Sequence, residues 1–144
     1  MTQPLHTTTA DRLRADGQRY TAQRRALVEL LVEAAQPLTI PQLLERQPRL
    51  AQSSVYRNLG LLERAGVVHR IVTSDEFARY ELAEDLTHHH HHLICSSCGT
   101  VADFTVSEQL ERTLERAMGN VEEGTGFRPE HHRLDLVGVC GNCR

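Results

Sequence analysis

The sequence predicts an α+β protein of 144 residues that is built in two parts. Apolar residues recur at helical spacing up to about residue 65, and two segments rich in β-branched residues follow. The remaining expected strands lie next to two Cys-x-x-Cys pairs. Helices that precede strands, rather than alternating with them, are typical of α+β folds.

Four helices are expected in the first part. Gly17 ends the first helix, which is short and polar, and Gly66 ends the fourth. Thr21 and Thr39 directly precede the second and third helices and are their expected N-caps. The expected helical ranges are 9–15, 22–36, 41–46 and 53–65.

A β-hairpin is expected after the fourth helix. Residues 67–72 and 77–82 are rich in β-branched and aromatic side chains, and the turn Ser74-Asp75-Glu76 separates them. A helix with a polar N-terminal end followed by a hairpin is the order of a winged helix-turn-helix, which inserts a helix into the major groove of DNA. Residues 1–82 are therefore expected to form a winged-helix DNA-binding domain.

The second part is expected to be a small α/β unit. Residues 83–88 are polar and acidic and form the expected hinge before residues 89–144. The stretch 119–126 is Gly-rich and acidic. The expected strands are 92–95, 101–104 and 133–139, and the expected helix is 107–118.

Charge is distributed unevenly between the two halves of the chain. Residues 1–72 carry 10 arginines and 6 acidic residues, whereas residues 73–144 carry 6 arginines and 13 acidic residues. Arginine binds phosphates through paired hydrogen bonds, so the basic half is expected to contact double-stranded DNA. No apolar segment approaches the roughly 20 residues of a membrane span, and the polar N-terminus does not resemble a signal peptide. A cytoplasmic protein without a membrane partner is therefore expected.

All four cysteines lie in two pairs, Cys95/Cys98 and Cys140/Cys143. Two such pairs, each next to a glycine and at the end of an expected strand, are typical of a tetrahedral Zn²⁺ site. The alternatives are disulfides or a redox dithiol, which a reducing cytoplasm disfavours. Because four thiolates leave no open coordination position, this zinc is expected to be structural.

Five consecutive histidines, His88–His92, precede the first cysteine pair. In a strand, alternate side chains face opposite sides, so His89 and His91 are expected on one side and His90 and His92 on the other. The run can therefore supply two ligands to each of two metal sites. Mixed imidazole and carboxylate ligation suits Zn²⁺, Fe²⁺, Mn²⁺ or Ni²⁺. Candidates for the remaining ligands are His69, Glu81, Asp103, Glu108, Glu111 and His132.

Five short motifs stand out along the chain. They are Arg19-Tyr20-Thr21-x-Gln23-Arg24, Ser54-Val55-Tyr56-Arg57-Asn58-Leu59, Gly66-Val67-Val68, Arg79-Tyr80-Glu81-Leu82, and the histidine run leading into Cys95-x-x-Cys98-Gly99. Together they resemble the ferric uptake regulator superfamily of metal sensors, over about residues 9–144. The resemblance implies a homodimer in which residues 89–144 form the zinc-binding dimerisation domain.

By position, the resemblance implies three metal sites in each chain. The four cysteines match the structural zinc ligands. The sensory ligands it implies are His69, Glu81, His90, His92 and Asp103. The ligands it implies for the third site, within the dimerisation domain, are His89, His91, Glu111 and His132. Small differences in spacing leave Glu108 open in place of Glu111, and Glu84 or Asp85 in place of Glu81. His69 favours Zn²⁺ as the regulatory metal, with Fe²⁺ or Mn²⁺ as alternatives.

The expected DNA contacts lie in the basic half. Tyr56 is out of phase with the apolar stripe of its helix and is therefore expected to be exposed. The residues expected to contact bases or phosphates are Arg19, Arg24, Ser53, Ser54, Tyr56 and Arg57. Sensory ligands lie on both sides of the hinge, so a bound metal is expected to select one orientation of the two domains.

The expected function is a metal-dependent, dimeric repressor that binds operator DNA and controls metal homeostasis. Zinc is the preferred signal, and iron, manganese, nickel or peroxide are the alternatives. A zinc hydrolase needs an open metal site and a general base, as in His-Glu-x-x-His, and the sequence contains no such motif. An interaction module without DNA binding leaves the charge asymmetry unexplained. Neither enzymatic activity nor a small-molecule substrate is expected.

Overall fold

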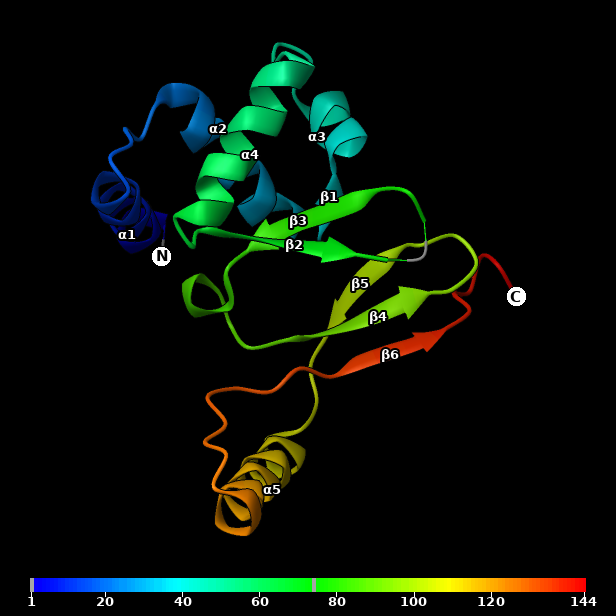
Figure 1. The fold of residues 1–144 in the computed structure, drawn as a ribbon. Helices are drawn as coiled ribbons and strands as arrows, with labels where there is room; N and C mark the ends of the chain where they lie inside the picture. Colours follow the sequence, from blue (N-terminus) through cyan, green and yellow to red (C-terminus); the bar gives the residue numbers. More distant parts are fainter. Residues whose placement is uncertain (1, 74) are drawn as a thin grey trace.

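The structure, a computed structural model, describes residues 2–73 and 75–144 and confirms the α+β class (Figure 1). Its helices are α1 (Thr2–Ala15), α2 (Ala22–Ala34), α3 (Ile40–Arg46), α4 (Gln52–Arg64), the 3₁₀ turn η1 (Glu84–Leu86) and α5 (Glu108–Thr125). Its strands are β1 (Leu38–Thr39), β2 (Val68–Val72), β3 (Ala78–Leu82), β4 (His91–Cys95), β5 (Val101–Phe104) and β6 (Asp135–Gly138). None of the described helices is both long and apolar enough to cross a membrane.

The N-terminal part combines helices α1–α4 with an antiparallel sheet in the order β1-β3-β2 (Figure 1). The predicted N-caps are confirmed, since the side chains of Thr21 and Thr39 accept hydrogen bonds from the backbone of the following helices. The main hydrophobic core lies between these helices and the sheet. Its side chains with no exposed surface include Leu13, Leu27, Val28, Leu43, Leu59, Leu62 and Val67.

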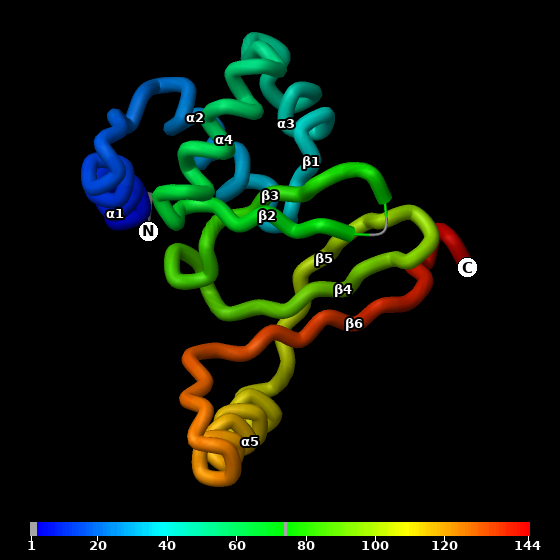
Figure 2. The backbone as a smooth tube through the Cα atoms, viewed as in Figure 1, coloured from blue at the N-terminus to red at the C-terminus, as the bar shows by residue number. Residues whose placement is uncertain are grey.

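The C-terminal sheet has the order β5-β4-β6, with β4 antiparallel to β5 and parallel to β6. Helix α5 extends away from this sheet (Figure 2) and has no buried residue. Large apolar side chains remain exposed here, including Phe127 at 68% and Val137 at 69%. Only Cys95 and Val101 are buried apolar residues among the described residues beyond 83. As a single chain, this part therefore has almost no hydrophobic core of its own.

The segment that joins the two sheets is fastened to the N-terminal part. Arg12 of α1 donates to the carbonyl of Gly66 at 2.6 Å and forms an ion pair with Asp85 in η1. The backbone N–H of Ala83 donates to the carbonyl of Val67 at 2.8 Å. Residues 83–88, expected to be a hinge, thus leave the β3 strand along a fixed path.

Three elements differ from the sequence-based expectation. Helix α1 begins at Thr2 rather than at residue 9, because Leu5, Thr9 and Leu13 share one buried face. Helix α5 continues past Met118, where it was expected to end, as far as Thr125, and its C-cap Gly126 has a φ of 74°. The two-residue strand β1 was not expected. In the predicted turn at residues 74–76, Ser74 lies outside the described residues.

Candidate metal centres

Three groups of side chains bring potential metal ligands together. Within each group, one ligand atom per residue lies within 4.8 Å of all the others. The groups are Cys95, Cys98, Cys140 and Cys143; Glu81, His90, His92 and Asp103; and His89, His91, Glu111 and His132. We call them the cysteine site, the interdomain site and the histidine-rich site.

The cysteine site joins the β4–β5 turn to the segment after β6. All four thiols are free of disulfide bonds, and Cys98 Sγ lies 3.8 Å from Cys140 Sγ. Tetrahedral Zn²⁺ with bonds of 2.3 Å separates its sulfur ligands by about 3.8 Å, so the spacing fits zinc. The backbone N–H groups of Cys140 and Cys98 donate to Cys95 Sγ at 3.3 and 3.5 Å. These bonds lower the pKa of the Cys95 thiol to about 6, which favours the thiolate that binds metal.

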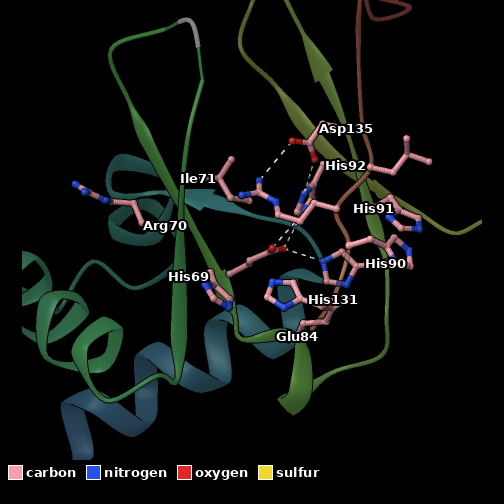
Figure 3. Close-up of a pocket in the computed structure, with 13 residues that line it drawn as sticks. His69, Arg70, Ile71, Glu84, His90, His91, His92, His131 and Asp135 are labelled. Carbon is pink, nitrogen blue, oxygen red and sulfur yellow. Dashed lines mark hydrogen bonds and ion pairs between the residues drawn. The ribbon is translucent and has the colours of Figure 1, made fainter. Parts of the chain in front are cut away.

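The interdomain site takes its ligands from both sheets. Glu81 lies on β3, and its carboxylate is 2.9 Å from Nε2 of His92, on β4, and 3.0 Å from Nε2 of His90, just before β4. Asp103 of β5 lies 3.8 Å from each of the same two imidazoles. Figure 3 shows His90 and His92 beside a cavity of about 180 Å³ that residues of both sheets line. Two imidazoles and two carboxylates converging across this gap form a donor set that fits a divalent cation.

The electrostatics of the interdomain site also fit a cation. Burial opposes ionisation of Glu81, but hydrogen bonds and charge from His92 and His90 outweigh it and lower the Glu81 pKa. The hydrogen bond to Glu81 raises the pKa of His92. Burial raises the pKa of Asp103, and its Oδ1 atom is buried without a hydrogen-bond partner among the described residues. Orphaned buried oxygen atoms are rare in proteins, and a bound cation would satisfy this one.

The histidine-rich site lies between β4, α5 and the segment before β6. Glu111 Oε1 is 2.7 Å from His91 Nε2, and Glu111 Oε2 is 3.1 Å from His132 Nε2. His89 Nε2 approaches the same carboxylate at 3.3 Å. Over the described part of the chain, His91 Nδ1 is buried without a hydrogen bond. Three imidazoles around one carboxylate are chemically suited to a zinc-like ion.

Two residues support these histidines in a role that the sequence did not predict, although Glu84 was an open alternative ligand. His92 Nδ1 lies 3.5 Å from Asp135 Oδ1, and His89 Nδ1 contacts Glu84. Such partners orient an imidazole so that its other nitrogen faces the metal. Asp135 reaches His92 because β6 pairs with β4 in parallel, with these two residues in register. That long-range pairing leaves no signal in the local sequence pattern.

The structure separates the alternatives for the acidic ligands. Glu81 lies in the interdomain site, whereas Glu84 contacts His89 and Asp85 pairs with Arg12. Glu111 lies in the histidine-rich site. The side chain of Glu108 is 95% exposed and lies 3.7 Å from Arg112.

His69 is the one predicted sensory residue that does not join its group. It pairs with Glu81 in the β2–β3 register and lines the same cavity, together with His131 (Figure 3), but it is exposed and lies outside the four-residue set. The residue that favoured zinc is therefore at the edge of the cavity rather than among the clustered donors.

The candidate DNA contacts lie around the N-terminal end of α4. Tyr56 is 58% exposed, as predicted from its phase, and Ser53, Arg57 and Arg19 are also exposed. Ala51, the N-cap residue, makes no side-chain capping bond, which leaves the first N–H groups of α4 free for a phosphate. Ser54 is half-buried. Arg24 is half-buried too, and its Nε donates to Asn58 Oδ1 at 3.0 Å, so it ties α2 to α4.

Comparison with known proteins gives a consistent picture. A family model described as "Ferric uptake regulator family" matches residues 15–137. The peroxide operon regulator of Bacillus subtilis is 34% identical over 135 residues, which cover 91% of this chain and 88% of that protein. The peroxide-responsive repressor PerR of Staphylococcus epidermidis is 29% identical over 136 residues, which cover 92% of this chain and 85% of the repressor.

Solved structures share the fold. The Helicobacter pylori ferric uptake regulator Fur superposes with a TM-score of 0.74 at 23% identity and covers 99% of this chain and 93% of its own. A zinc-bound manganese uptake regulator superposes with a TM-score of 0.64 at 31% identity and covers 94% of this chain and 98% of its own. The chain therefore belongs to the ferric uptake regulator family, whose members are metal-responsive transcription regulators and not enzymes.

Proposed function

We propose that this protein is a dimeric repressor whose affinity for operator DNA depends on a divalent metal at the interdomain site. Residues 1–82 bind DNA, residues 83–88 connect, and residues 89–144 form the dimer. One observation carries the proposal: Glu81 belongs to the N-terminal sheet, whereas His92 and Asp103 belong to the C-terminal sheet and His90 lies just before its strand β4. A metal that binds all four stabilises this orientation of the DNA-binding domain relative to its partner copy.

The dimer is supported by the uncovered apolar surface of the C-terminal part. Helix α5 buries none of its residues, and Leu110 and Val121 on it are 42% and 46% exposed. On β6, an edge strand, Leu136 is 50% exposed. Exposed apolar side chains on a helix without buried residues and on an unpaired edge strand are typical of a part that a second copy covers.

The donor set supports a divalent first-row metal but does not by itself favour zinc. The interdomain site combines two imidazoles and two carboxylates and contains no thiolate. This chemistry suits Fe²⁺ and Mn²⁺ as well as Zn²⁺. The preference for zinc rested on His69, which lies outside the donor group, so the regulatory metal has to be identified by titration. Structural zinc is proposed only for the cysteine site.

The decisive experiment measures operator binding at buffered free concentrations of Zn²⁺, Fe²⁺, Mn²⁺ and Ni²⁺, with elemental analysis of the same samples. The protein's own promoter region serves as the DNA. We expect one zinc per chain to remain after mild chelation, and one further metal to restore tight DNA binding. Equal DNA affinity with and without the second metal would refute the proposal.

Protons are expected to compete with the metal at this site. Each imidazole must lose its proton before it binds metal, and Glu81 helps to raise the pKa of both His90 and His92 above 6.5. Apparent metal affinity should therefore rise with pH through 6.5 and level off only above the raised pKa values. Chelator competition between pH 6 and 8.5 measures this, and an affinity that is already constant from pH 6 would contradict it.

The DNA interface predicts a specific effect of Arg57→Ala. Arg57 is exposed on the first turns of α4, so its loss should weaken DNA binding and reduce the slope of log K against log salt by about one per chain. Arg64→Ala is the matched control, because Arg64 is exposed at the other end of the same helix. The prediction is wrong if the two variants lower affinity and slope to the same extent.

A response to peroxide is a second candidate, because two of the similar proteins are named as peroxide regulators. Iron bound by imidazoles and carboxylates can react with peroxide, whereas Mn²⁺ and Zn²⁺ react far less readily. Hydrogen peroxide should then release DNA from the Fe²⁺-loaded protein and leave the Mn²⁺-loaded protein bound. If hydrogen peroxide releases DNA from neither form, the peroxide response is refuted and metal availability is the signal.

A further inference from the structure

The two sheets also meet at a second place, far from the interdomain site. The turn between β2 and β3 reaches the loop of the cysteine site between β4 and β5 (Figure 1). Asp75, in that turn, packs directly against Gly99, the residue that follows Cys98. A Cβ atom at Gly99 would overlap the Asp75 carboxylate and lie 3.0 Å from Asp75 Cβ, so only glycine leaves room for this contact.

The Asp75 side chain is held rigidly in the position that contacts Gly99. Arg79, which is only 7% exposed, donates to the two Asp75 carboxylate oxygens at 2.9 and 2.8 Å. The hydroxyl of Thr73 donates to Asp75 Oδ1 at 2.8 Å, and the backbone N–H of Phe77 donates to it at 3.3 Å. The carboxylate is therefore a fixed part of the turn rather than a mobile surface group.

The hairpin connects this contact mechanically to the interdomain site. Asp75 and Glu81 are six residues apart, which corresponds to at most about 20 Å of chain. Strands β2 and β3 are paired over five residue pairs up to Val72 and Ala78, which joins the turn that holds Asp75 to the strand that holds Glu81. A rotation of the hairpin by about 10° about Glu81 would move its tip by up to about 3 Å, enough to lose the contact with Gly99. The tip contact thus restricts the rotations that would carry Glu81 away from His90 and His92.

We propose that Asp75 and Gly99 are positioning residues for the interdomain metal site. Through their contact, the loop of the cysteine site raises the metal affinity of the interdomain site. This inference rests on the proposed function of the interdomain site. The contact favours the sheet orientation in which the four donors already lie together, so less of the metal's binding energy is needed to align the domains. Neither residue contacts a donor of that site.

The test uses Gly99→Ala in the full-length protein with its cysteine-site zinc retained. Gly99 has a φ of 76°, so alanine also introduces backbone strain, and Gly17→Ala is the matched control because Gly17 has a φ of 74° with open space around it. Chelator competition with Mn²⁺ and Zn²⁺ measures the interdomain affinity. We expect Gly99→Ala to weaken it by about 2- to 30-fold, the range typical of coupling changes at residues outside a binding site, and Gly17→Ala to leave it within twofold.

A double-mutant cycle separates positioning from general damage. Asp75→Ala should weaken metal binding to a similar extent, whereas Glu76→Ala, at an exposed position in the same turn, should not. Once Asp75 is alanine, Gly99→Ala should have little further effect, because the contact is already lost. If the Gly99→Ala protein loses its cysteine-site zinc, the comparison of interdomain metal affinity between Asp75→Ala and Glu76→Ala tests the inference by itself. Additive effects, or an Asp75→Ala protein with wild-type affinity, would overturn the inference.

The outcomes also distinguish this inference from the proposed function. If the wild-type protein binds metal and Glu81→Ala abolishes that binding, while Asp75→Ala does not change it, only the positioning role fails. If the wild-type protein binds no metal beyond the cysteine-site zinc, the proposed function itself fails.

Discussion

Replacing Cys95 with serine should unfold the C-terminal sheet while the N-terminal helices stay folded. The reason is the distribution of the core: residues such as Leu27 and Leu59 are completely buried near the N-terminal sheet, whereas almost no apolar side chain is buried beyond residue 83. Structural zinc contributes about 10–16 kcal/mol of binding energy in small zinc domains, and here little else stabilises the second sheet. Losing a buried thiolate should remove most of that stabilisation.

Circular dichroism and zinc release measure this effect. We expect partial loss of strand signal at room temperature, one zinc fewer per chain, and loss of the dimer on size-exclusion chromatography. Ser97→Ala is the control, because Ser97 lies between Cys95 and Cys98 and is exposed. A Cys95→Ser protein that stays dimeric and melts like the wild type would show that the zinc is dispensable for folding.

Glu81→Ala should abolish the response of DNA binding to metal without unfolding the protein. Glu81 is the only donor of the interdomain group that belongs to the N-terminal sheet, so its loss leaves the metal bound to one domain only. Loss of a residue that merely orients a ligand reduces metal affinity by about 10- to 100-fold, and loss of a ligand should cost at least as much. We therefore expect DNA affinity to become low and independent of added metal.

Anisotropy titrations of operator DNA, with and without metal, check this expectation. Glu76→Ala removes an exposed carboxylate from the same hairpin and should respond to metal like the wild type. Calorimetry should show that the Glu81→Ala protein retains its thermal stability. If added metal still raises the DNA affinity of the Glu81→Ala protein, the regulatory metal binds at the histidine-rich site instead.

Local chemistry made much of the fold predictable. The caps Thr21 and Thr39 and the helix end at Gly66 could be predicted because each depends on a few neighbouring residues. Helix α5 was expected to end too early, because Gly119 and Gly124 only weaken a helix and Gly126 is the residue with positive φ. Helix α1 was expected to begin too late, because its polar sequence hides a buried face.

In the candidate sites too, features set by neighbouring residues were predictable, and features set by the packing of distant elements were not. The alternation of His89–His92 was expected from strand geometry, and the observed groups have this alternation although β4 begins only at His91. The contacts of Glu81 with one group and Glu111 with another depend on how distant elements pack, and so the sequence left Glu84, Asp85 and Glu108 open. Asp135 was missed for this reason, and so was the contact between Asp75 and Gly99.

The exposed apolar surface on α5 and β6 has a thermodynamic consequence. If a second copy covers that surface, part of the folding free energy is gained only on association, and mass action then governs stability. Each tenfold dilution should lower the apparent unfolding free energy of the dimer by about 1.4 kcal/mol. The melting temperature of this protein is then a function of its concentration, and a cell that makes few copies holds a less stable regulator than one that makes many.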